Sequence, residues 1–168
     1  MLSAAQIIEL LQLAPLPVEG GYFRRSYTAA DTVAGSALPA RYAGDRRLCG
    51  AIYYLLHGDE FSALHRLATD EIYHFYLGDP AELLVLHPDG RHELNVIGPD
   101  LLAGQQVQLV VPAGAWQGSR VRLGGRLTLL GTTMAPAYAD ADFELGSRVA
   151  LQARYPARAE LIRALTRE

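Results

Sequence analysis

The sequence predicts an all-β fold, an antiparallel sandwich or barrel with a short helix at each end of the chain. Eight short β-type segments lie between positions 48 and 134, each bounded by Gly, Pro or Asp. Patterns of helical period occur only near the two ends. Close strand spacing without intervening helices favours antiparallel pairing over a parallel α/β sheet. We expect one domain over residues 1–168, with the core barrel at about 20–150.

The first element is a helix over residues 4–13. Ser3 and Gln6 have the spacing of a capping box, in which each side chain bonds the backbone of the other residue. The apolar stripe that follows has helical spacing and consists of Ile7, Ile8, Leu10 and Leu11. Pro15 and Pro17 end the helix, because proline lacks the amide donor and biases the residue before it towards extended conformations.

The strands follow from residue 22. Residues 22–27, after Gly20-Gly21, combine aromatic and polar side chains as strands do, and residues 28–46 read as a long surface loop. A hairpin turn is predicted at Pro88-Asp89-Gly90. The eight later segments are 48–57, 61–68, 71–77, 82–87, 91–97, 106–111, 119–123 and 126–134.

The pattern loosens after Pro136. The acidic residues of the next loop are predicted to be solvated surface charges, and they are Asp140, Asp142 and Glu144. Pro156 lies where a helix start tolerates proline, and an amphipathic stripe follows with Leu161, Ile162 and Leu165. The chain should therefore end in a helix.

Composition narrows the classes of function. The 168 residues hold 15 positively charged residues, all of them Arg, against 18 Asp and Glu, and no basic stripe suits nucleic acid. No apolar run approaches the length that spans a membrane. A lone Cys49 and a start without a basic region indicate the cytoplasm. Because lysine is absent, a Schiff base or a phosphate-binding lysine is excluded.

The densest group of functional side chains lies at residues 58–78. Two strands that meet near Thr69 would bring His65 close to Glu71, and strand alternation puts Tyr73 on the same face as Glu71 and His74 on the other. Burying a carboxylate beside an imidazole is costly unless the two are paired or bind a metal. This cost indicates a functional site.

These residues resemble the first motif of the cupins, small jelly-roll barrels. That motif runs from Gly58 through His65 to Glu71 and Gly78, with Leu67 where a second metal-binding His would stand. The second cupin motif is matched more loosely by Gly104 and by 112–114, with Gln117 in the position of its His and Val121 in that of its Asn.

Within the cupins, the sequence resembles one branch more specifically, the uncharacterised cupin-5 family. Five separated segments carry it in order, and they are PVEGGYFRRSY, AIYYLL, HRLATDEIYHFYLGDP, VPAGAWQGSR and MAPAYADADFEL. The resemblance implies a double-stranded β-helix of the RmlC-like type, a jelly-roll barrel that holds a small molecule. It also implies two alternatives for the cofactor, none or a divalent metal, Zn, Ni, Mn or Fe. Its ligands would be His65, Glu71 and Gln117.

A second use of the same residues needs no metal. In the dTDP-sugar epimerase cupins, a His acts as base, a Tyr as acid, and arginines orient phosphates. The resemblance implies His65 as base beside Glu71, and Tyr73 as acid, with Tyr53 an alternative. Spacing alone does not choose among the tyrosines, or between Arg24 and Arg25. The ligand-binding set we take is Tyr22, Arg24, Tyr53, Trp116 and Gln117.

Three functions follow from these alternatives. The first is an isomerase, epimerase or lyase acting on a carbohydrate-like or carbonyl-bearing ligand. The second is a non-catalytic barrel that binds or senses a metabolite, and the third is a metal-dependent enzyme. The expected partner is a small molecule, with neither nucleic acid nor membrane. We expect a homodimer, because the strand at 22–27 and the loop at 28–46 offer a sheet edge.

Overall fold

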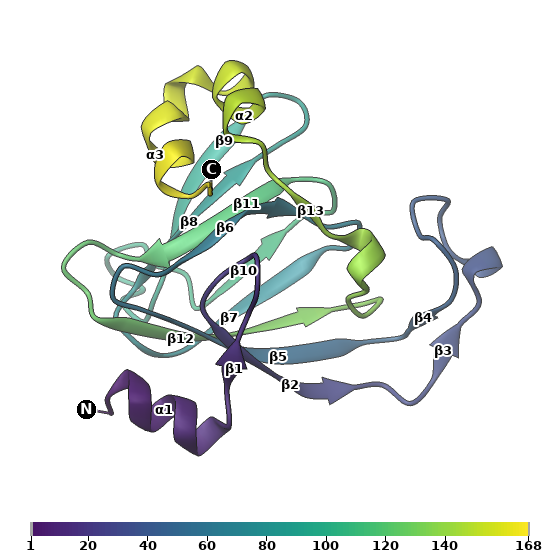
Figure 1. Cartoon of the computed structure of the whole chain (residues 1–168), viewed down its shortest axis with the longest axis horizontal. Helices are drawn as coiled ribbons and strands as arrows, with labels where there is room; N and C mark the ends of the chain where they lie inside the picture. The colour runs from purple at the N-terminus through teal and green to yellow at the C-terminus, as the bar shows by residue number, and fades with distance from the viewer. Residues whose placement is uncertain (1, 168) are drawn as a thin grey trace.

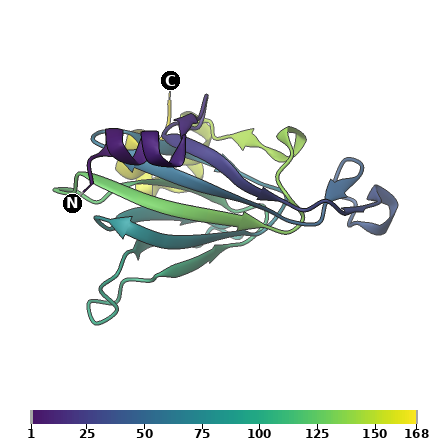
Figure 2. The ribbon, with the colours of Figure 1, turned by 90° about the horizontal axis from the view of Figure 1, so that it is seen from below.

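Two antiparallel sheets face each other in the computed structural model, which describes residues 2–167 (Figures 1 and 2). The first sheet has the strand order β1 (Ala14–Pro15), β2 (Tyr22–Thr28), β5 (Gly50–His57), β12 (Leu127–Met134), β7 (Glu71–Gly78) and β10 (Gln108–Val111). The second has the order β13 (Glu144–Leu145), β6 (Phe61–Arg66), β11 (Trp116–Val121), β8 (Ala81–Leu86) and β9 (His92–Ile97). This architecture confirms the predicted all-β jelly roll.

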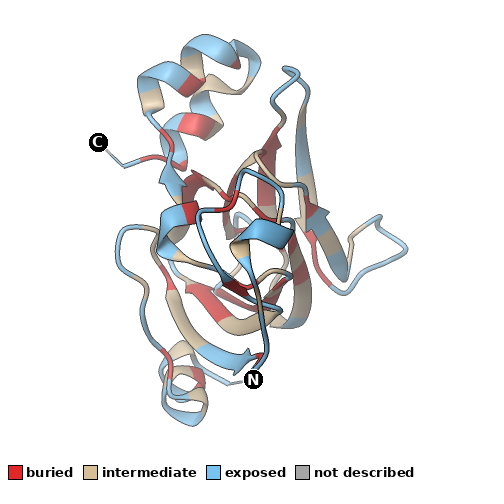
Figure 3. Ribbon diagram, turned by 90° about the vertical axis from the view of Figure 1, so that its right-hand side faces the viewer, coloured by how far each residue is buried: buried red, intermediate tan, exposed pale blue. Residues whose placement is uncertain are grey.

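The core lies between the sheets, where alternate side chains of each strand point inward, and Figure 3 marks the buried residues of the strands in red. Its buried members are Tyr73, Ala81, Leu83, Val85, Ile97, Val111, Ala115 and Leu130. Register fixes which residues share the inner face of the first sheet. Arg25 pairs with Ile52, Ile52 with Thr132, and Thr132 with Tyr73. This row reaches across four strands, so it brings residues from distant parts of the chain to one wall.

The N-terminal helix α1 (Ala4–Leu11) covers the outer face of the first sheet (Figure 1). Its capping box is confirmed, since the Ser3 hydroxyl accepts from the Gln6 amide and the Gln6 side chain accepts from the Ser3 amide. The helix ends two residues earlier than predicted, because Gln12 turns left-handed at φ 53°. Ile7 then packs against Leu55 and Leu129 of the sheet.

Two helices, α2 (Arg148–Arg154) and α3 (Ala159–Ala164), cover the outer face of the second sheet. The sequence predicts only the later one. The Ser147 hydroxyl caps α2 by accepting from the Ala150 amide, a start signal that the sequence analysis missed. Buried Leu151, Tyr155 and Ile162 pack with Leu64 and Leu84 of the sheet. Among the described residues, no helix is long and apolar enough to cross a membrane.

The segment between β2 and β5 was predicted to be a surface loop, but it also contains regular structure. It holds the short strands β3 (Thr32–Val33) and β4 (Arg46–Arg47), which pair with each other. Arg46 is buried, and its guanidinium binds both carboxylate oxygens of Asp142, at 2.7 and 3.2 Å. The prediction that Asp142 is a solvated surface charge is therefore wrong, because this ion pair compensates the burial of the carboxylate.

The predicted strands agree with the structure within two residues at each end, except the strand placed at 119–123. This strand, β11, begins at Trp116, three residues earlier, so Gln117 points inward from a strand. At the sheet edge, β1 pairs with Tyr22 and Phe23 of β2. The homodimer expected from this edge stays a prediction.

Candidate functional site

His65 stands on β6 with its ring inside the barrel, directly opposite Gln117 on β11. The ring is 2% exposed, and its Nδ1 lies 2.8 Å from the backbone oxygen of Ala63. A carbonyl oxygen only accepts, so Nδ1 carries the hydrogen, and the lone pair of the neutral ring is on Nε2. The stacked ring of Phe143, with centroids 5.2 Å apart, fixes the imidazole further. The structure thus holds a base in one tautomer and one orientation.

Glu71, the first residue of β7, faces His65 across the barrel and is 6% exposed. The Gln117 amide nitrogen donates to Glu71 Oε2 at 2.6 Å, and the same nitrogen lies 3.3 Å from His65 Nε2. Burial raises the pKa of Glu71, while the nearby His65 ring and the hydrogen bonds from Thr132 and Gln117 oppose this shift. The amide thus joins the base to a carboxylate that is costly to ionise.

Replacing Glu71 with glutamine is expected to stabilise the protein at neutral pH. Burial raises the folded-state pKa above its ordinary value of 4.5, so stability is greatest below that value and is lost as pH rises through the raised pKa. Urea denaturation should show Glu71→Gln above the parent protein at about pH 8 and level with it below about pH 4. Glu9 is exposed, so Glu9→Gln is the control, and its stability relative to the parent protein is expected not to change with pH in this way. A lower stability of Glu71→Gln at about pH 8 would contradict the burial cost.

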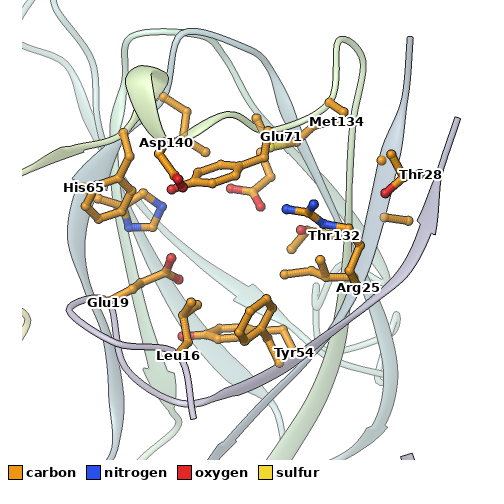
Figure 4. A pocket seen from close by; sticks show the side chains of 18 of the residues that line it. Leu16, Glu19, Arg25, Thr28, Tyr54, His65, Glu71, Thr132, Met134 and Asp140 are labelled. Atoms are coloured by element: carbon orange, nitrogen blue, oxygen red, sulfur yellow. The ribbon is translucent and has the colours of Figure 1, made fainter. Parts of the chain in front are cut away.

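A cavity of about 530 Å³ opens beside these residues, at one end of the barrel (Figure 4). Two segments outside the sheets complete its wall. They are the turn between β1 and β2, which contributes Glu19, and the segment before β13, which contributes Asp140 and Phe143. The volume suits one small metabolite.

Arg25 brings a positive charge into this cavity (Figure 4). Within residues 2–167, its guanidinium forms no hydrogen bond or ion pair. Because each carboxylate or phosphate offers a matching pair of acceptors, a free guanidinium facing a pocket is suited to an anionic group.

Comparison with known proteins connects this site to a family. The family model described as Cupin superfamily (DUF985), named Cupin_5, matches residues 5–146. The chain belongs to the Cupin_5 family. The resemblance stated from the sequence is therefore confirmed, and no curated protein matches this Cupin_5 chain.

Solved structures agree with this assignment. A protein of Shewanella oneidensis is 34% identical, with 99% of each chain covered and a TM-score of 0.86. A hypothetical protein of Leishmania major is 29% identical over 99% of this chain and all of the other, with a TM-score of 0.87. An oxalate decarboxylase of Bacillus subtilis, described for its Mn(II) centres, is 13% identical over 92% of this chain and 38% of its own, with a TM-score of 0.52, and shares the fold alone.

The residues of this Cupin_5 chain do not fit a metal well. Between His65 Nε2 and Glu71 Oε2 lies the amide nitrogen of Gln117, a hydrogen-bond donor. The amide oxygen Oε1 is buried and has no hydrogen-bond partner among residues 2–167. In the described part of the chain, no three His, Cys, Asp or Glu side chains are grouped to hold an ion. The divalent metal stays a prediction that this donor set does not favour, and we derive the chemistry from the side chains alone.

Several predicted ligand-binding residues of the Cupin_5 chain lie outside the pocket. Tyr22 and Arg24 point to the outer face of the first sheet, where Tyr22 stacks on His57 and Arg24 lies over the ring of Tyr53. Trp116 points outward from β11, under the guanidinium of Arg66. These placements correct the predictions for Tyr22, Arg24, Tyr53 and Trp116. The physical reason is strand alternation, which sends neighbours of inward residues outward.

The structure brings the other predicted residues together. His65, Glu71 and Tyr73 line the cavity, and Gln117 lies behind them in contact with two of the three. The cavity is also lined by three residues that were not predicted, Glu19, Tyr54 and Thr132, and by Arg25 in place of the predicted Arg24. For the three inward strand residues, alternation was the available signal. Glu19 lies in a turn, where no periodicity applies.

Proposed function

We propose that this Cupin_5 protein is an acid–base enzyme of the isomerase, epimerase or lyase type. Its ligand is a small, carbohydrate-like molecule with a carbonyl group. The observation that carries the proposal is the hydrogen bond from His65 Nδ1 to the Ala63 carbonyl oxygen, which places the lone pair of the neutral ring on Nε2, beside a cavity of ligand size. A general base needs a lone pair that is held within hydrogen-bond reach of the proton it removes.

The reaction follows from the charges around His65. Nε2 takes a proton from the carbon next to the ligand carbonyl, and the electron pair of the broken C–H bond moves towards the carbonyl oxygen. The ring then becomes an imidazolium, and the carboxylate of Glu71 stabilises this charge. Gln117 holds the side chains of His65 and Glu71 in position relative to each other, because it contacts both. In the ground state Glu71 is costly to bury, and proton transfer to His65 relieves that cost.

Arg25 binds the part of the ligand that lies away from its carbonyl group. An anionic group that enters the cavity can pair with its free guanidinium, whereas Arg24 is directed away on the outer face. The ligand would thus carry a carboxylate or phosphate at a distance from its carbonyl group.

The test uses three aldoses that differ only in the group at carbon 6: D-glucuronate, with a carboxylate, D-glucose 6-phosphate, with a phosphate, and D-glucose, with a neutral hydroxymethyl group. Each has a C2–H next to its carbonyl, and proton NMR in D₂O measures replacement of that hydrogen by deuterium. We expect exchange with the two anions and much less with glucose. The two anionic arms distinguish a carboxylate from a phosphate ligand.

The matched variants are Arg25→Gln and Arg24→Gln. Arg25→Gln should lower kcat/KM for the anionic sugars by about 10- to 100-fold, since a hydrogen bond to a charged group contributes about 1.5–3 kcal/mol. Arg24→Gln should leave it unchanged. Equal effects of both variants would contradict the assignment of Arg25. Anion binding to the parent protein without C2 exchange would favour the non-catalytic binding function, and neither binding nor exchange would contradict this ligand class.

A further inference from the structure

Glu19 enters the cavity from a turn that no periodic pattern predicts. Figure 4 shows its carboxylate directed into the same space as the side chains of His65 and Glu71. The hydroxyl of Ser62, a fully buried residue on β6, donates to Glu19 Oε1 at 2.8 Å. A buried hydroxyl that orients a half-buried carboxylate towards a pocket is an arrangement that a surface charge does not need.

The backbone that carries Glu19 is strained. Val18 has φ 68°, and the Glu19 amide donates to the Pro17 carbonyl at 2.7 Å, which closes a three-residue γ-turn of the rare positive-φ form. A β-branched residue is disfavoured at positive φ. The Val18 side chain is 58% exposed, so its burial does not compensate for the strain. Strain of this kind persists only where surrounding contacts enforce it, and it is concentrated at functional sites.

Those contacts come from two other parts of the chain, the C-terminal segment and strand β6. Arg167 donates to the carbonyl oxygens of Val18 and Glu19 at 2.9 and 3.1 Å. The Ala63 amide donates to the Glu19 carbonyl at 2.8 Å. Gly20, at φ 107°, passes so close to Phe61 that an added Cβ would lie 2.4 Å from its carbonyl oxygen. The turn is held in place from both ends.

Two carboxylates thus share one cavity. The negative charge of Glu19 contributes to the raised pKa of Glu71, and also to those of Tyr54 and Tyr73, whose rings line the same space. Burial and the Glu71 charge raise the pKa of Tyr73 well above its ordinary value, which makes its hydroxyl a poor acid near neutral pH. The proton-donor function that the sequence assigned to Tyr73 needs another group.

We infer that Glu19 is a catalytic acid of this pocket. In its ionised form it repels Glu71, and in its protonated form it protonates the carbonyl oxygen of the ligand while His65 removes the proton from the adjacent carbon. This inference rests on the proposed function. The C–H bond breaks, its electron pair forms a carbon–carbon double bond, and the carbonyl oxygen takes the Glu19 proton to give an enediol. Return of a proton to carbon and loss of the hydroxyl proton to Glu19 complete the cycle, so no other reactant is consumed.

The kinetic test uses C2 exchange of D-glucose 6-phosphate. Glu19→Gln is expected to lower kcat by about 10²-fold with a small change in KM, because glutamine keeps the shape but donates no acidic proton. Glu19→Asp should restore part of the rate, and Glu9→Gln should match the parent. Arg167→Gln should also lower kcat, since it releases the turn that positions Glu19. An unchanged kcat in Glu19→Gln would overturn the inference.

A second test needs no ligand and separates this inference from the proposed function. If Glu19 and Glu71 share the cavity, each glutamine replacement relieves the same repulsion, so the double variant should gain less in urea midpoint at about pH 8 than the two single gains together. Glu9→Gln with Glu71→Gln should be additive. Additive gains for the Glu19 and Glu71 replacements would contradict the inference that the two carboxylates share the cavity. A non-additive pair in a protein without C2 exchange would keep Glu19 in the pocket and reject the acid–base function.

Discussion

Replacing His65 with glutamine is expected to lower the rate of C2 exchange with D-glucose 6-phosphate by about 10²- to 10⁴-fold, the range that general acid–base groups contribute. Glutamine can keep a donor towards the Ala63 carbonyl, but it has no basic lone pair in place of Nε2. The melting temperature should stay within a few degrees, because the two side chains are similar in size. Rate and stability can be measured on the same preparation.

The matched control is His74→Gln. His74 lies on β7 but faces outward, where its Nε2 is 3.1 Å from the Thr133 hydroxyl and its Nδ1 is 3.2 Å from the Gln108 amide. It shares the residue type of His65 but not the cavity, so its replacement should leave exchange unchanged. If His65→Gln kept the parent rate, the base would be another group, and the proposed reaction would lose its main support.

Replacing Asp142 with alanine is expected to lower the free energy of unfolding by on the order of 3 kcal/mol, because the charge of Arg46 is then buried without its partner. Urea denaturation measures the loss. The double variant Arg46→Met/Asp142→Leu should recover most of it, since an apolar pair can replace a buried ion pair at little cost. A single variant with parent-like stability would contradict this account.

A nearby exposed ion pair provides the comparison. Glu144 binds Arg66 at 2.6 Å, with both side chains largely exposed, and Glu144→Ala should change stability by no more than about 1 kcal/mol. The difference between the two pairs also concerns the pocket. Asp142 lies between Asp140 and Phe143, which line the cavity, so the buried pair fixes one wall of the site. Asp142→Ala should therefore also weaken binding of D-glucose 6-phosphate.

Local patterns in the sequence determined much of the fold. The capping box at Ser3 and Gln6 starts α1 as predicted, and the turn at 88–90 joins β8 to β9. The spacing of His65 and Glu71, with strand alternation, was enough to place both on inner faces. These features depend on residues within a few positions of one another, so the sequence shows them directly.

The choice between Arg24 and Arg25 needed the tertiary structure. Adjacent strand residues point to opposite faces, and the β2 pattern of aromatic and polar side chains does not indicate which face is inside. Pairing with β5 settles it, because Arg25 lies opposite Ile52 and shares its inner face. A bulge after Arg25 then shifts the register, so that Thr28 also reaches the cavity.

Short-range periodicity and motif spacing encode the family, the two-sheet barrel and the His65–Glu71 pair, so these features could be predicted before any contact was known. Only the tertiary structure added Glu19 to the pocket and paired Arg46 with Asp142, which is 96 positions away. Both depend on a chain path that local propensity does not specify. The direction of a turn side chain such as Glu19 is set only when the strands around the turn pack. The ion pair of Arg46 and Asp142 forms only when distant segments of the chain come together.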